Sequence, residues 1–189
     1  MKLKKLLEQI TLELNVPKPE DAYDFDNIKV SDLGYGNYYK YTYTNNRGDV
    51  MEVTNLIKPV TADAVSGKIT QPGKVIFIAF GLYDDEDEKE DGYHDDESEE
   101  RKYKAKTGAG DTIKVLATVV EATKQTMKKE GGEDKIYGIA FAPSDKKRKN
   151  IYDHYLTTLF PNFKKDQRSS SAGFTFFINQ DFKGRAKVD

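Results

Sequence analysis

A chain of 189 residues with 12% aromatic side chains is long enough to bury a core and too aromatic for a disordered protein. It has no cysteine and only two histidines, which excludes a disulfide framework, a thiol nucleophile and a His-rich metal site, so no metal is predicted. The net charge of −2 hides an asymmetry. Residues 84–100 carry twelve acidic side chains and one lysine, which leaves +9 on the rest of the chain.

The beginning of the chain is amphipathic. Apolar residues recur at helical spacing over residues 2–14, which predicts a helix that ends before Pro17. This segment lacks the uninterrupted apolar region of a signal peptide, and no apolar run approaches the 18 or so residues of a membrane helix. We therefore expect a protein that is neither secreted nor membrane-spanning.

A hairpin and a buried strand come next. Residues 37–44 alternate aromatic and polar side chains, which predicts a strand, and residues 45–48 predict a turn into a returning strand over residues 49–57. A loop or short helical turn is expected from residue 59 to residue 67. The continuous apolar run at residues 74–81 predicts a central strand that is buried on both faces.

The second half of the chain alternates helices and strands. An apolar-faced helix is predicted over residues 111–129, ended by Gly131 and Gly132, and a buried strand over residues 136–142. A second helix is predicted over residues 146–159, ended by Pro161. A polar loop over residues 164–171 and a last strand over residues 173–179 complete the chain.

This order of elements predicts an α+β fold in which helices flank a mixed, mostly antiparallel sheet. Residues 1–189 are expected to form a single domain. The acidic stretch at about residues 84–101 is then a mobile, solvated insertion between two strands. The alternative is that this acidic segment folds over the basic surface of the domain or mimics a polyanion.

The first candidate site is the glycine turn that opens the long helix. A helix N-terminus presents free backbone N–H groups and the positive end of the helix dipole, so it favours an anion or a cofactor phosphate. The alternative is that the glycines serve only a tight turn and close packing. The residues of this candidate site are Gly108, Ala109, Gly110, Asp111 and Thr112.

The second candidate site is the start of the second helix, which is strongly basic. Lysines at a helix N-terminus oppose the dipole, so phosphate contact is one reason for their presence, and solubility is the alternative. The phosphate would belong to nucleic acid or to the 3′-phosphate of coenzyme A. The residues are Lys146, Lys147, Arg148 and Lys149.

The order of elements and the glycine turn resemble the GCN5-related N-acetyltransferase (GNAT) fold. In that family the loop amides hold the acetyl-CoA pyrophosphate, the next strand splays away to admit the pantetheine, and a tyrosine on the following helix protonates the thiolate. The resemblance implies Tyr152 or Tyr155 as that catalytic acid, although both tyrosines also suit core packing. The chain departs from the family at three positions. Ala105 stands where the family has Gln or Arg, and Leu159 stands where it has Gly. Asp111 places a negative charge in the first turn of the long helix.

A second resemblance concerns the residue pattern itself. The Gly-Asp-x-x-Lys-Val-x-Ala-Thr-Val run from Gly110, the Ile-x-Gly-Ile-x-Phe strand from Ile136 and the Arg-x-x-x-Tyr of Arg148 and Tyr152 are similar to a family of small phage proteins. This resemblance implies a viral protein in the host cytoplasm or the virion. We therefore expect a non-enzymatic phage protein that is virion-associated or binds a phage or host protein, without a cofactor.

Two other functions stay open from the sequence. One is an acetyl-CoA-dependent N-acyltransferase, which would use acetyl-CoA as its cofactor. The other is a nucleic-acid-binding protein that uses the basic helix start.

Overall fold

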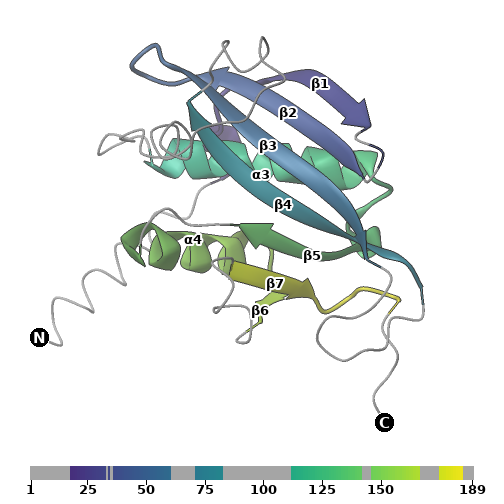
Figure 1. The fold of residues 1–189 in the computed structure, drawn as a ribbon. Coiled ribbons are helices and arrows are strands. Elements are labelled where there is room, and N and C mark those ends of the chain that lie inside the picture. The colour runs from purple at the N-terminus through teal and green to yellow at the C-terminus, as the bar shows by residue number, and fades with distance from the viewer. Residues whose placement is uncertain are drawn as a thin grey trace, which may run out of the picture.

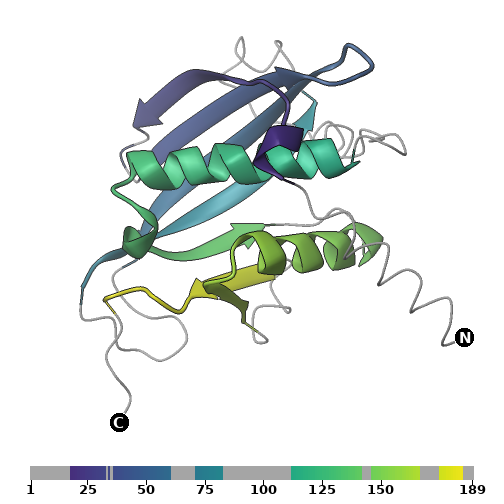
Figure 2. The same ribbon diagram turned by 180° about the vertical axis from the view of Figure 1, so that it is seen from behind.

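A seven-stranded mixed sheet with two α-helices on one face forms the part of the chain that the computed structural model describes (Figures 1 and 2). The described residues are 18–60 apart from 33 and 35, then 71–82, 112–141, 146–166 and 175–184. The strand order is β1-β2-β3-β4-β5-β7-β6. The α+β class with a mixed, mostly antiparallel sheet is thus confirmed.

The first four strands form an antiparallel meander. They are β1 (Asp26–Asp32), β2 (Asn37–Thr44), β3 (Val50–Val60) and β4 (Gly73–Leu82). Asn45 forms the turn between β2 and β3, because its Oδ1 accepts from the backbone N–H groups of residues 47 and 49 at 2.9 and 3.0 Å. This is the side-chain-to-backbone turn for which asparagine is favoured.

The chain then crosses over the sheet. Helix α3 (Thr112–Lys129) leads through the short 3₁₀ helix η3 (Glu133–Lys135) into β5 (Ile136–Phe141), which pairs with β4 in parallel. Gly131 and Gly132 end α3 with φ angles of 99° and 108°. Their N–H groups bond to the carbonyl groups of residues 128 and 127, which is the Schellman arrangement.

A second crossover completes the sheet. Helix α4 (Lys146–Leu159) follows β5, and β6 (Phe163–Lys165) and β7 (Thr175–Asn179) form an antiparallel pair. Strand β7 inserts between β5 and β6. Figure 2 shows α3 lying across the meander and α4 lying beside β5 and β7 on the same face of the sheet, as right-handed crossovers require.

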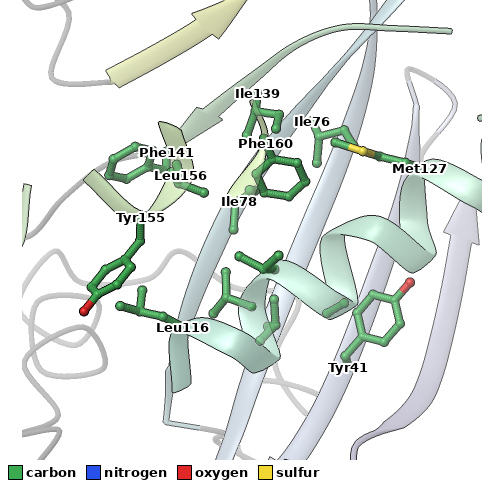
Figure 3. Close-up of a cluster of buried hydrophobic side chains, with 14 of the residues drawn as sticks. Tyr41, Ile76, Ile78, Leu116, Met127, Ile139, Phe141, Tyr155, Leu156 and Phe160 are labelled. Carbon is green, nitrogen blue, oxygen red and sulfur yellow. The ribbon is translucent and has the colours of Figure 1, made fainter. Parts of the chain in front are cut away.

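The main core lies between this face and the two helices. Figure 3 shows Ile76 and Ile78 of β4 among side chains of α3, α4 and β5. Alternate strand residues such as Val75 and Tyr137 form a smaller cluster on the opposite face with Phe182, which follows β7. Strand β5 is buried along its whole length, as predicted, and β4, the strand predicted as central, lies between β3 and β5.

Most predicted elements are confirmed within one to three residues, and the differences lie in short or edge strands. Strand β1 was not expected, and β6 occupies the start of the predicted loop at residues 164–171. Strand β3 continues to Val60 through part of the loop predicted from residue 59. The predicted helix at residues 2–14 and the acidic stretch at 84–101 lie outside the described residues.

Candidate functional site

The carboxyl ends of β4 and β5 lie at the edge of the sheet where α3 and α4 begin. These strands pair from Lys74 and Ile136 to Ile78 and Phe141, and β4 continues to Leu82 beside β3 alone. Figure 1 shows the two strands diverging toward these ends. In sheets with parallel strands, ligands bind at the carboxyl ends of the strands, which is this edge.

The predicted anion site at the glycine turn falls mostly outside the described residues, which exclude Gly108, Ala109, Gly110 and Asp111. Thr112 is described; it begins α3 and is half-buried. The first turn of α3 contains no acidic residue. It does contain Lys114, whose Nζ lies 4.3 Å from the ring centre of Tyr23, so this ammonium group is held by an aromatic face.

Of the two predicted catalytic tyrosines, the structure describes the side chain of Tyr155 but not that of Tyr152. Tyr155 has 4% of its surface exposed, and burial raises the pKa of its hydroxyl. Figure 3 shows its ring beside Leu116 of α3, with the hydroxyl at the outer end of the cluster. Tyr152 lies in α4, and its side chain is outside the described set. Tyr155 is therefore a core tyrosine with a protonated hydroxyl at neutral pH.

The four basic residues predicted to contact phosphate form the first turn of α4. The helix begins at Lys146 and has no acidic residue in this turn. Its position places Lys146, Lys147, Arg148 and Lys149 at the same edge as the start of α3. Farther along the helix, Asp153 pairs with Lys165 of β6, so that lysine is neutralised by a neighbour.

A buried polar cluster around Glu130 was not predicted. The Glu130 side chain is 3% exposed and follows the last turn of α3. Its Oε1 accepts from Asn37 Nδ2 at 2.8 Å and from the Tyr39 hydroxyl at 2.5 Å. Lys74 Nζ donates to Oε2 at 2.7 Å and to the Glu130 carbonyl at 3.2 Å. One carboxylate thus joins α3 to β2 and β4.

The electrostatics of this cluster follow from burial and hydrogen bonding. Burial pushes the pKa of Glu130 upward, but the bonds from Asn37, Lys74 and Tyr39 outweigh it and hold that pKa below its ordinary value. Burial, together with the Glu130 carboxylate, raises the pKa of Tyr39. The cluster is a charged, fully bonded anchor, which is what a buried carboxylate requires to be stable.

A second polar group lies beneath α3. Thr126 Oγ1 accepts from Asn55 Nδ2 at 2.8 Å, lies 2.9 Å from the Tyr41 hydroxyl and donates to the Ala122 carbonyl at 3.1 Å. Asn55 is fully buried and stands opposite Tyr39 in the β2–β3 register. Its Oδ1 has no partner among the described residues.

The sequence contained part of this signal. The alternation of Tyr39, Tyr41 and Tyr43 indicated one face packed on a helix, and all three rings are buried. Nothing in the spacing of residues indicated that Asn55 and Glu130 would meet them, because Glu130 is 91 residues from Tyr39.

Comparisons of this chain with protein families, with curated proteins and with solved structures found no match. In the described part of the chain, no group of three or more His, Cys, Asp or Glu side chains is arranged to hold a metal ion. No helix among the described residues is long and apolar enough to cross a membrane.

Proposed function

We propose that this chain is a phage-encoded, GNAT-like domain that binds a phage or host protein without catalysing acyl transfer. The observation that carries this proposal is the filled interior behind the paired part of β4 and β5. Ile76, Ile139 and Phe141 are 0%, 1% and 4% exposed, and the two strands stay paired through Ile78 and Phe141 before they diverge. These side chains leave no room for a pantetheine arm to pass between the paired parts of the two strands.

The GNAT-like part of the proposal is supported by connectivity. Strand β4 is followed by α3, α3 leads to a parallel neighbour β5, and β5 is followed by α4, which carries Tyr155. This succession is the one that the resemblance implies. The phage part is supported by the residue pattern that starts at Gly110.

The absence of catalysis is supported by the surroundings of Tyr155. A tyrosine that protonates a leaving thiolate must reach the sulfur atom. The ring of Tyr155 is buried against the core, with the His154 ring 5.5 Å away at 67°, and its hydroxyl lies at the outer end of the cluster (Figure 3). Asp111, directly before α3, adds a charge that repels a pyrophosphate.

A phosphate-bearing ligand is the second candidate, because two helices begin at one edge of the sheet. The positive ends of the α3 and α4 dipoles and the basic first turn of α4 favour an anion there. Acetyl-CoA would make the chain an N-acyltransferase, with Tyr155 near the thiolate. Nucleic acid would contact the same lysines through its phosphates.

One set of measurements separates these functions. We expect that acetyl-CoA at millimolar concentration leaves the melting temperature unchanged and that no coenzyme A is released in the presence of amines. A ligand at 100 times its dissociation constant would stabilise the fold by about 2.7 kcal/mol, which is easily measured. Release of coenzyme A that Tyr155→Phe abolishes, and that the buried control Tyr137→Phe does not, would establish the acyltransferase instead.

Binding to nucleic acid has its own signature. It would weaken steeply with salt and be lost in Lys147→Glu/Arg148→Glu, but not in Lys128→Glu at the far end of α3. Protein binding is tested by crosslinking in infected cells and mass spectrometry. We expect crosslinks to one phage or host protein, and crosslinks only within the chain would contradict the proposal.

A further inference from the structure

A cavity of about 380 Å³ lies toward the end of the sheet farthest from β6, and it shares only the first turn of α3 with the candidate site described above. It is surrounded by the segment just before β1 (residues 22–25, called the strap below), by the adjoining ends of β2 and β3 and by the first turn of α3. Its volume falls within the usual range of small-molecule sites, about 300–1,000 Å³. Its lining includes Tyr23, Asp24, Asp26, Tyr43 and Lys114.

The walls of this cavity are held in place before any ligand arrives. The backbone N–H of Tyr23 donates to Thr118 Oγ1 of α3 at 2.8 Å, and the Tyr23 hydroxyl accepts from the backbone N–H of Asn46 at 3.1 Å. The Tyr23 ring stacks on Tyr43 with centres 5.2 Å apart and planes at 19°. Tyr23 therefore ties the strap to both α3 and the hairpin, so a ligand would not have to order these elements.

The charges in the cavity are of both signs and do not neutralise one another. Asp24 lies on the strap, Asp26 begins β1 and both are exposed, while Lys114 lies on α3. In the described structure neither carboxylate forms an ion pair, and the Lys114 ammonium rests over the Tyr23 ring at 4.3 Å instead of contacting a carboxylate. Three charged groups thus share one cavity with their capacity for charge-assisted hydrogen bonds unused.

We propose that this cavity binds a small zwitterion of the amino-acid class, with its ammonium group at Asp24 and Asp26 and its carboxylate at Lys114. Tyr23 and Tyr43, which stack on each other and are almost wholly buried, also line the cavity. A simple cation would leave Lys114 repelling it, and a simple anion would be repelled by two carboxylates. A ligand that carries both charges meets an opposite charge at each end.

The test starts with the free amino acids as probes. Each of the twenty is added singly at about 10 mM, which saturates even a millimolar site, and binding is read by ligand-observed NMR and by the melting temperature. For the strongest binder, the matching amine without the carboxylate and the matching acid without the ammonium are measured next. We expect both analogues to bind at least about tenfold more weakly, because each loses one charge-assisted contact.

Variants of the cavity complete the test. Asp24→Asn/Asp26→Asn should weaken the amino acid about tenfold and leave the binding of the deaminated acid unchanged or stronger. Lys114→Met should also weaken the amino acid about tenfold, and it should leave the binding of the decarboxylated amine unchanged or stronger. Asp181→Asn, which changes an exposed carboxylate outside the cavity, is the control for the loss of a surface charge and should change nothing.

The proposal is overturned if no amino acid binds at that concentration, or if the amine or the acid binds as tightly as the zwitterion. It is also overturned if the cavity variants weaken binding no more than Asp181→Asn does. Unfolding midpoints of all variants, measured without ligand, show whether a loss of binding reflects a loss of fold. None of these outcomes depends on whether the domain transfers acyl groups or binds a protein.

Discussion

Lys74 Nζ lies 2.7 Å from Glu130 Oε2 and also donates to the Glu130 main-chain carbonyl, so one lysine at the start of β4 holds both ends of the residue that caps α3. The lysine is partly exposed and the carboxylate is buried. A carboxylate at a helix C-terminus opposes the helix dipole, and the ammonium group offsets this cost. The pair fixes the C-terminal end of α3 against the sheet.

Replacing Glu130 by glutamine is expected to destabilise the fold by about 2–4 kcal/mol. The amide cannot accept from Lys74 and Tyr39 as a carboxylate does, and its own NH₂ group would face the ammonium. Urea unfolding measures the loss. Glu121→Gln on the outer side of the same helix is the control and should stay within about 0.5 kcal/mol of the wild type. Equal effects of the two changes would show that the anchor contributes nothing.

The same carboxylate predicts how stability depends on pH. The pKa of Glu130 is lower in the folded chain than in the unfolded chain, where it is close to about 4.3. A depressed pKa means that the stabilisation is fully present above the unfolded value and is lost as the pH falls through the folded value. Unfolding free energies measured from neutral pH downward should therefore fall more steeply in the wild type than in Glu130→Gln. Parallel curves would contradict the assignment.

Thr126→Val is expected to cost about 2–4 kcal/mol of unfolding free energy, because it leaves the buried Asn55 amide and the Tyr41 hydroxyl without their shared acceptor. Thr123→Val is a matched control. Thr123 lies on the same helix, is equally buried and bonds only to the carbonyl four residues before it. Its replacement should cost less than about 1 kcal/mol. A similar loss of unfolding free energy in both variants would show that the effect comes from altered packing and not from the shared hydrogen bonds of Thr126.

Gly131→Ala is expected to cost about 1–2 kcal/mol, because a φ of 99° is unfavourable for any residue with a Cβ atom. Gly131→Asn should cost less, since asparagine visits positive φ more readily. Thermal unfolding of the two variants measures the difference. If alanine were tolerated as well as asparagine, the helix would end by another means than the Schellman turn.

Long, strongly patterned elements could be predicted from the sequence. The apolar runs that became β4 and β5, the apolar face of α3 and the glycine pair at 131 and 132 carry their structure in local spacing and backbone preference. Strand β1 could not be predicted in this way. Its Asp-Asn-Ile-Lys-Val-Ser-Asp sequence is polar, and it is a strand because it pairs with β2 at the edge of the sheet.

For the candidate site too, some features could be predicted from the sequence and others could not. The sequence by itself determined that α3 and α4 begin near glycines or lysines and that three tyrosines of β2 share one face. Only the tertiary structure decided that the ring of Tyr155 packs against the core, that Glu130 meets Lys74 and Tyr39, and that Asp24, Asp26 and Lys114 line one cavity. The physical reason is that local spacing specifies which side of an element is apolar. Which polar groups meet depends on crossovers and strand order that bring distant segments together.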